Sequence, residues 1–212
     1  MALRYEIIPV TPFLQNSTLL WDDETQEAVL TDVGGESERL LAEVNKRGLT
    51  LTAVWLTHGH VDHVGGVVAL RGQIDVPVLG PHRDDDFWIQ QLPAAAAAYR
   101  FPPSPVFTPA QWLQDGDALS VGQYVFQVLH IPGHTPGHVV FYCAKMPLLI
   151  AGDVLFRESI GRTDFPRSNH DDLIRCIREK LWMLPPNTRV IPGHGAMTTI
   201  EHEIARNPFV RA

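Results

Sequence analysis

The chain contains the stretch Leu56-Thr57-His58-Gly59-His60-Val61-Asp62-His63-Val64-Gly65-Gly66, and the rest of the sequence is interpreted outward from it. Three histidines and one aspartate fall within six positions of this stretch. The apolar run 51–57 precedes them, and a short apolar run bounded by a turn is typical of a buried strand. Imidazole and carboxylate groups together suit zinc, iron and manganese. The stretch therefore predicts a metal site on the loop that leaves a strand, in preference to an ordinary exposed polar loop.

The composition predicts one α/β domain that spans residues 1–212. Of the 212 residues 45% are hydrophobic and 19% are charged, which is enough to close a sizeable core. The net charge is −7. Proteins that bind duplex DNA or membrane surfaces have basic surfaces, so no nucleic-acid or membrane partner is expected. The charge still allows a small anion to be held by a local arginine.

The sequence also predicts a location in the cytoplasm. The first six residues lack the long apolar region of a secretory signal, so none is expected. No apolar run approaches the roughly 18 residues that a membrane-spanning helix requires. The two cysteines, Cys143 and Cys176, lie far apart and outside any CxxC pattern, as packing cysteines of a reducing compartment do.

The first half of the chain is expected to form strands around one helix. We expect strands at 7–10, 17–21, 27–32, 51–57 and 76–79. Asp22-Asp23-Glu24 predicts a hairpin turn between the second and third of them. Ser37 is expected to cap a helix with an apolar stripe that ends at Gly48, and 67–70 can start another. Pro77 predicts that the strand at 76–79 lies at a sheet edge.

Residues 81–111 do not form a convincing core element. They contain an alanine run at 94–98 and the proline cluster Pro102-Pro103-Ser104-Pro105. One interpretation is a helical excursion that ends in a stiff loop and covers a pocket with Phe87, Trp88 and Phe101. The other is a surface insertion whose aromatic side chains are simply buried.

Strands dominate again in the second half of the chain. We expect them at 124–131, 139–142, 148–151 and 188–191. A helix is expected to start at Asp171-Asp172 and to stop at Pro185-Pro186. A short helix is expected around 199–206.

Four of these strands end in a small-residue turn that carries a histidine or aspartate: the 58–63 loop, His134, Asp153 and His194. Functional side chains gather outside the carboxyl ends of strands. The inventory of five histidines and two aspartates exceeds the four ligands of a structural zinc. It suits two metals about 3.5–4 Å apart that share a carboxylate. The spacing alone does not assign each histidine to a metal.

The ordered motifs resemble the metallo-β-lactamase superfamily. They are Thr-His-Gly-His-Val-Asp-His, His-Thr-Pro-Gly-His, Gly-Asp and Pro-Gly-His-Gly. The resemblance implies an αββα sandwich, with two mixed sheets flanked by helices. It also implies that the first metal is held by His58, His60 and His134, that the second is held by Asp62, His63 and His194, and that Asp153 bridges them. Zinc β-lactamases usually carry cysteine at position 153, so antibiotic hydrolysis is not expected. Diiron flavoproteins carry glutamate at position 60.

Within the superfamily the chain is most similar to glyoxalase II, the hydroxyacylglutathione hydrolases, in their short bacterial form. The similarity includes residues 13–16, 85–88, 161–166 and 207–209. The helical C-terminal domain that supplies glutathione contacts in the long form is missing. The resemblance implies hydrolysis of S-lactoylglutathione to lactate and glutathione, with two divalent ions as cofactors. Zinc is the first expectation for these ions, and iron and manganese are the alternatives.

The implied chemistry assigns roles to the two aspartates. A water on a metal loses its proton near pH 7, which supplies the hydroxide that attacks the thioester. A thiol pKa near 8.5 lets the thiolate leave without a strong general acid. Asp62 and Asp153 are thus ligands first, and Asp62 is also a candidate proton shuttle.

Several further side chains are candidates for supporting roles. Asp32 and His138 resemble residues that orient ligands, although plain buried polar residues would look the same. Arg162 could bind a glutathione carboxylate, but pairing with Asp164 is slightly preferred. Phe87 and Trp88 are candidate substrate contacts. The remaining histidines, which lack any ligand context, are expected in surface or packing roles: His82, His130, His170 and His202.

Three other functions are weighed against the hydrolase. A persulfide dioxygenase shares the scaffold and a Gly-Arg-Thr-Asp-Phe segment like 161–165, and would use one iron on His58, His134 and Asp153. A non-catalytic metal-binding module is disfavoured because this ligand set leaves coordination positions open. A nuclease is disfavoured by the acidic balance. The sequence gives no indication of the oligomeric state.

Overall fold

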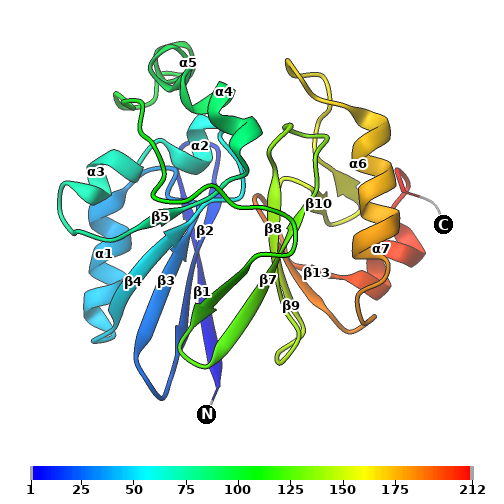
Figure 1. Ribbon diagram of the computed structural model, residues 1–212, viewed down its shortest axis with the longest axis horizontal. Coiled ribbons are helices and arrows are strands. Elements are labelled where there is room, and N and C mark those ends of the chain that lie inside the picture. The colour runs from blue at the N-terminus through cyan, green and yellow to red at the C-terminus, as the bar shows by residue number, and fades with distance from the viewer. Residues whose placement is uncertain (1, 211–212) are drawn as a thin grey trace.

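The computed structural model describes residues 2–210 and has four layers, with two β-sheets packed face to face and helices on the outer side of each (Figure 1). The apolar faces of the two sheets meet around Trp55, Phe126 and Phe141, all three almost completely buried. The Trp55 ring lies 5.3 Å from the Phe126 ring and 5.4 Å from the Phe141 ring. The expected αββα sandwich is confirmed.

The first sheet has the strand order β1-β2-β3-β4-β5. The strands are β1 (Leu3–Val10), β2 (Gln15–Asp22), β3 (Glu27–Thr31), β4 (Thr50–Trp55) and β5 (Val78–Leu79). The first three strands are antiparallel, which confirms the hairpin, and β3, β4 and β5 are parallel. The sheet is therefore mixed, and β5 lies at its edge as Pro77 predicted.

Two helices cover the outer face of this sheet, α1 (Ser37–Lys46) and α3 (Val67–Arg71) (Figure 1). Leu40 and Val44 of α1 pack with Leu70 of α3 against apolar side chains of the strands. The prediction that Ser37 caps α1 is wrong. Ser37 is the first helical residue, and Glu36 precedes it in a left-handed conformation without a capping side-chain bond.

The second sheet has the strand order β13-β12-β9-β8-β7-β6. Its strands are β6 (Ala118–Val121), β7 (Tyr124–His130), β8 (Val139–Cys143), β9 (Leu148–Gly152), β12 (Arg189–Pro192) and β13 (Thr198–Thr199). Because β8 is antiparallel to both neighbours and β12 is parallel to β9, the strands β7, β9 and β12 all point the same way. Their carboxyl ends therefore lie at one edge. A separate hairpin, β10 (Leu155–Phe156) with β11 (Ser159–Ile160), follows β9.

The outer face of the second sheet is covered by α6 (His170–Cys176), a π-helical turn (Ile177–Leu181) that continues it, and α7 (Ile200–Arg206) (Figure 1). The expected helix near residue 171 is confirmed. It begins one residue earlier, because the Asn169 side chain accepts a hydrogen bond from the Asp172 backbone N–H. Leu173, Ile177 and Leu181 are fully buried against the sheet.

Residues 81–111 form a helical excursion, as in the first of the two interpretations, although Phe101 is buried in the core and does not line the pocket. A 3₁₀ turn (Arg83–Asp85), α4 (Asp86–Ile89) and α5 (Leu92–Tyr99) precede an irregular segment through the proline cluster. In Figure 1 these helices lie at the same end of the molecule as α2 (Val61–Val64). Ile89, Leu92 and Phe101 are buried in the first core, so this segment is anchored. Among the described residues no helix is both long and apolar enough to cross a membrane.

Candidate metal centre

The four sequence-predicted loops converge, and they come from both sheets. The 58–63 loop follows β4 of the first sheet, while His134, Asp153 and His194 follow β7, β9 and β12 of the second. All seven side chains predicted as ligands belong to three mutually close groups. The groups are His58, His60 and His134; His58, His63 and Asp153; and Asp62, His63 and His194. The polypeptide thus places these side chains together although up to 136 positions separate them in sequence (194 − 58).

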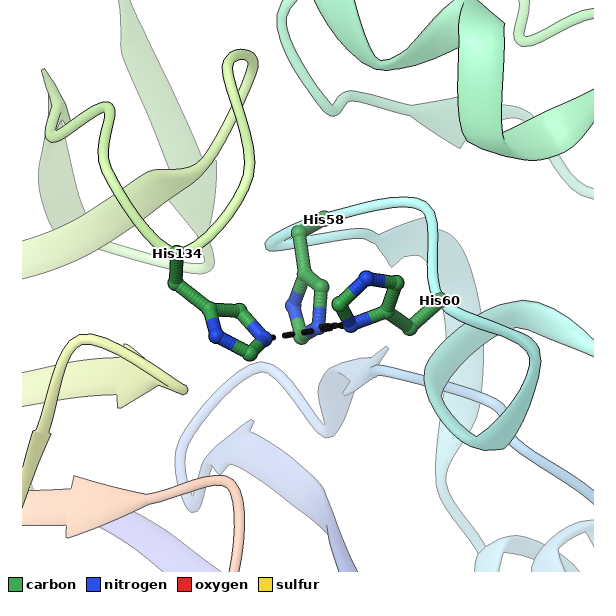
Figure 2. Close-up of side chains that lie close together, drawn as sticks. All are labelled: His58, His60 and His134. Carbon is green, nitrogen blue, oxygen red and sulfur yellow. Dashed lines mark hydrogen bonds between the residues drawn. The ribbon is translucent and has the colours of Figure 1, made fainter. Parts of the chain in front are cut away.

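The first group is a cluster of three ring nitrogens (Figure 2). The Nδ1 atom of His60 lies 3.1 Å from Nε2 of His58 and 3.1 Å from Nε2 of His134. Two nitrogens that bind one zinc ion at about 2.0–2.1 Å with tetrahedral angles lie about 3.3 Å apart. The spacing of this cluster therefore matches the first coordination sphere of a single divalent ion.

The second cluster combines two ring nitrogens and a carboxylate. Nε2 of His63 lies 3.4 Å from Nε2 of His194, and Oδ2 of Asp62 lies 3.2 Å from the same His194 atom. Asp153 lies between the clusters. Its Oδ1 atom is 3.3 Å from Nε2 of His63, and its Oδ2 atom is 3.5 Å from Nε2 of His134. One carboxylate thus faces ligands of both clusters, as a bridging ligand would.

Backbone carbonyl groups fix the tautomers of two histidines. Nδ1 of His134 lies 2.8 Å from the Arg162 carbonyl oxygen, and Nδ1 of His194 lies 3.1 Å from the Phe13 carbonyl oxygen. A carbonyl oxygen only accepts, so each Nδ1 must carry the proton and donate. In the neutral ring Nε2 then presents a lone pair to its cluster, which is the state that a metal requires.

Asp32 and Thr57 fix the tautomers of His63 and His58, the other two histidines whose Nε2 atoms face the clusters. Oδ2 of Asp32 accepts from Nδ1 of His63 at 3.0 Å and from the Thr57 hydroxyl at 2.7 Å. Since the Thr57 hydroxyl proton is donated to Asp32, its oxygen accepts from Nδ1 of His58 at 3.0 Å. The backbone N–H of Thr57 also donates to Oδ1 of Asp32 at 2.8 Å. One buried carboxylate therefore orients a histidine in each cluster, which favours the orienting role of Asp32 over that of a plain buried polar residue.

Among the described residues ten buried side-chain nitrogen or oxygen atoms have no hydrogen-bond partner. One of them, Oδ1 of Asp153, lies in this centre, 3.3 Å from Nε2 of His63. A buried carboxylate oxygen without a donor is costly, and a metal ion at that atom would remove the cost. Lone pairs of neutral rings that face one another at 3.1 Å likewise repel unless a cation lies between them. The residues therefore fit a pair of divalent ions.

The electrostatics of the two clusters differ. Burial lowers the pKa of His60 to about 3 and holds the pKa of His58 well below its usual value. Burial also opposes the charged form of His63, but the carboxylates of Asp153 and Asp62 outweigh it and raise the pKa of His63 well above its usual value. His194 behaves like His63, because its hydrogen bond with Asp62 outweighs burial and raises its pKa. The second cluster therefore holds protons more strongly than the first.

His138 supports the centre, as the sequence suggested for it. Its Nε2 atom accepts a hydrogen bond from the Asp153 backbone N–H at 3.0 Å. Its ring stacks on His58 with centroids 4.6 Å apart. These contacts fix the position of the bridging aspartate and the plane of one ligand ring.

Asp85 is a supporting residue to which sequence reasoning gave no role. Its fully buried carboxylate accepts from the Gly59 N–H at 2.7 Å, the Thr135 hydroxyl at 2.8 Å and the Gly137 N–H at 2.6 Å. These donors belong to the loops that carry His58, His60 and His134. Asp85 thus joins loops from the two sheets, and the only signal for it was the segment 85–88 that resembles the family.

Atoms of two predicted ligands approach the backbone at Gly193, directly before His194, so closely that no side chain fits there. A Cβ atom at Gly193 would lie 2.1 Å from Oδ1 of Asp153 and 2.7 Å from Cε1 of His63. At Gly152 the backbone has a φ of +48°, which disfavours side chains with a Cβ. Gly193 is thus required by the close approach of the two ligands, and Gly152 by its backbone conformation.

A pocket of about 750 Å³ opens over the clusters. Trp88 lines it and packs edge-on against His60, with ring centroids 4.5 Å apart. Phe87 does not line it; this ring lies 3.9 Å from the Arg167 guanidinium carbon and faces a separate depression. The other aromatic side chains of the pocket wall are Phe13, Tyr99, Phe156 and Phe165.

Arg162 lines the pocket but is already paired. Its Nε and Nη2 atoms donate to both carboxylate oxygens of Asp164 at 2.9 and 2.8 Å. Of the two alternatives for Arg162, a substrate carboxylate or Asp164, the structure thus has the pairing with Asp164, which the sequence slightly favours. Arg157 also lines the pocket, and the sequence gave no reason to single it out.

The remaining histidines lie outside the seven-residue centre. His82 stacks on His130 with centroids 4.3 Å apart, and these two rings with Asp84 form a further group of ligand-type side chains. His170 contacts the Thr163 hydroxyl, and His202 pairs with Glu158.

Comparison with known proteins gives consistent matches over the whole chain. A family model for the metallo-beta-lactamase superfamily matches residues 10–194. The hydroxyacylglutathione hydrolase GloC of Haemophilus influenzae is 43% identical over 99% of both chains.

Solved structures give the same fold. The crystal structure of the B3 metallo-beta-lactamase BLEG-1 is 37% identical, with a TM-score of 0.91 over 99% of this chain and 100% of that chain. TTHA1623 in a di-iron-bound form is 40% identical, with a TM-score of 0.87 over 96% and 99% of the two chains.

Proposed function

The chain belongs to the metallo-beta-lactamase superfamily of metallo-hydrolases, and from that premise we propose that it hydrolyses thioesters, with S-lactoylglutathione or a near relative as substrate. The observation that carries the proposal is the pair of three-ligand clusters that face a single carboxylate beneath an aromatic-walled pocket. The similarity to GloC supports the choice of a glutathione thioester.

In this proposal His58, His60 and His134 would hold one divalent ion, Asp62, His63 and His194 would hold the other, and Asp153 would serve as a shared ligand. Such a metal pair supplies an activated water at neutral pH and polarises the substrate carbonyl group. The similarity to a protein solved with two irons supports iron as well as zinc for this pair. The location proposed for the reaction is the cytoplasm, because Cys143 and Cys176 are both free and buried.

The side chains of the protein position the substrate and handle protons. Asp62 lines the pocket, and its Oδ2 atom lies 3.2 Å from Nε2 of His194, so it is placed to hold a proton beside the second cluster. Trp88 and Phe165 lie against the rim of the first cluster and keep water from the far side of His60. A thiolate leaving group with a thiol pKa near 8.5 needs no dedicated acid.

The test is a substrate panel on protein of known metal content. Zinc-loaded and iron-loaded protein is assayed with S-lactoylglutathione, a β-lactam and glutathione persulfide, by following thiol release, ring opening and oxygen uptake. The proposal expects thiol release to exceed the other two activities. Ring opening as the fastest reaction would contradict the proposal. The β-lactam is included because BLEG-1, to which the chain is similar, is named a β-lactamase.

A second candidate is an iron-dependent persulfide dioxygenase, which would use His58, His134 and Asp153. The observation that favours it is that the 161–165 segment, which resembles that of the dioxygenases, contacts one of these ligands: the Arg162 carbonyl oxygen accepts from Nδ1 of His134 at 2.8 Å. Oxygen uptake with glutathione persulfide by protein that holds a single iron would support this candidate over the hydrolase.

A further inference from the structure

A second depression lies next to the metal-lined pocket. It has a volume of about 380 Å³, and its lining includes Arg157, Arg189, Tyr5, Met197 and His202. None of these residues belongs to the metal centre. We call it the arginine depression.

The arginine depression is continuous with the pocket in two ways. Arg157 lines both of them. The segment that leaves the metal centre also runs from one to the other, because residues 194–196 line the pocket and residues 197–199 line the depression. Four residues span at most about 14 Å, so a ligand of that length reaches from the second cluster to the depression.

The charge balance of the depression favours an anion. Among the described residues the Arg157 guanidinium has no hydrogen bond or ion pair. The Arg189 guanidinium has no carboxylate partner but donates to the Tyr5 hydroxyl at 3.1 Å. The nearby carboxylate of Glu158 is bound to His202 at 2.9 Å. Two guanidinium groups therefore face the depression without a carboxylate partner of their own, in a protein whose net charge is −7.

Arg162, unlike Arg157, is already paired. Arg162 stands at the pocket wall with both carboxylate oxygens of Asp164 bound to it. An incoming anion would have to displace that carboxylate, whereas Arg157 is available without displacing any partner. Guanidinium groups bind carboxylates and phosphates through paired N–H donors.

We propose that the arginine depression binds the anionic end of the substrate's thiol carrier, a carboxylate or a phosphate, while the thioester group lies at the metal centre. This inference rests on the proposed thioesterase function. An extended tripeptide spans about 10 Å, and the separation of the second cluster from the depression is at most about 14 Å, so a tripeptide thioester with its acyl group is of comparable length.

The test compares two thioesters with the same acyl group on metal-loaded protein. S-lactoylglutathione has an anionic carrier, and S-lactoyl-N-acetylcysteamine has a neutral one. In Arg157→Gln and Arg189→Gln we expect the ratio of the KM for the anionic ester to that for the neutral ester to rise about tenfold, equivalent to about 1.4 kcal/mol. Arg71→Gln, an exposed arginine of α3 on the opposite outer layer, is the matched control and should leave the ratio unchanged. An unchanged ratio in both variants would overturn the proposal.

A binding measurement separates this proposal from the thioesterase function. S-methylglutathione, which carries carboxylates, and desulfo-coenzyme A, which carries phosphates, are titrated calorimetrically into metal-loaded protein. Binding of either probe that weakens about tenfold in Arg157→Gln but not in Arg71→Gln supports the depression as an anion site even if no thioester is hydrolysed. The probe that binds more tightly identifies the anion. If neither probe binds, or if both variants bind equally well, the anion site is refuted while the proposed hydrolase can still stand.

Discussion

Replacing Asp32 with asparagine should weaken the second metal specifically. Asp32 has a φ of +53°, a conformation that asparagine adopts almost as readily as aspartate, so the backbone should be unchanged. The side chains have nearly the same shape. The substitution therefore isolates the hydrogen bonds that Asp32 makes.

The geometry predicts which hydrogen bond fails. The backbone N–H of Thr57 requires an oxygen at the Oδ1 position, so the new NH₂ group takes the Oδ2 position. There it meets Nδ1 of His63, which donated to Oδ2 at 3.0 Å. Two donors repel, and the ring relieves this only by moving its proton to Nε2, the atom that faces the second cluster. The metal must then displace that proton.

The loss of a supporting partner of this kind typically weakens metal affinity about 10- to 100-fold, or about 1.4–2.7 kcal/mol. Stepwise dissociation constants from competition with a chromophoric chelator measure this loss. We expect the larger loss in the constant for the second ion. The change for the first should be smaller, because the Thr57 hydroxyl also loses its acceptor at Oδ2 but its oxygen still accepts from Nδ1 of His58. Asp75→Asn, the same change at an exposed position, is the control. Unchanged constants in Asp32→Asn, or a loss confined to the first ion, would refute the tautomer argument.

Three further predictions concern the same centre. Gly193→Ala should lower the metal content from two ions toward one by elemental analysis, because its Cβ would lie 2.1 Å from Oδ1 of Asp153, whereas Gly72→Ala, with its nearest contact at 3.4 Å, should keep both. As the pH falls the second cluster should lose its ion first, because carboxylates raise the pKa values of His63 and His194 whereas burial lowers that of His60 to about 3. The metal retained after dialysis between pH 5 and 8 measures this loss, and loss of the ion from the first cluster before the second would contradict the prediction. Asp153→Ala should lose metal and activity together, and full activity in that variant would defeat the shared role of Asp153.

Much of the fold could be predicted because local patterns and tertiary structure agree. The apolar run before His58 is a buried strand in the structure, and the turn at 22–24 forms the predicted hairpin. The strand ends also predicted which side chains meet, since parallel strands bring their carboxyl ends to one edge. Strands of two residues such as β13 carry too little periodicity to be detected.

What the sequence could not predict depends on contacts between distant residues. Asp32 and His63 are 31 positions apart, so neither pattern nor spacing shows that one orients the other. Asp85 reaches Gly59 and Gly137, which are 26 and 52 positions away, and its isolated segment resembles an ordinary acidic turn. Phe87 and Trp88 are neighbours, but successive helical side chains point about 100° apart, so only Trp88 faces the pocket.

The most direct test of the central claim is anomalous diffraction from crystals of the metal-loaded protein, combined with elemental analysis. The account predicts close to two ions per chain and two anomalous peaks about 3.5–4 Å apart, with Asp153 between them. One peak should lie among His58, His60 and His134, and the other among Asp62, His63 and His194. A single fully occupied peak, with His194 and Asp62 free of metal in protein of full activity, would contradict the account.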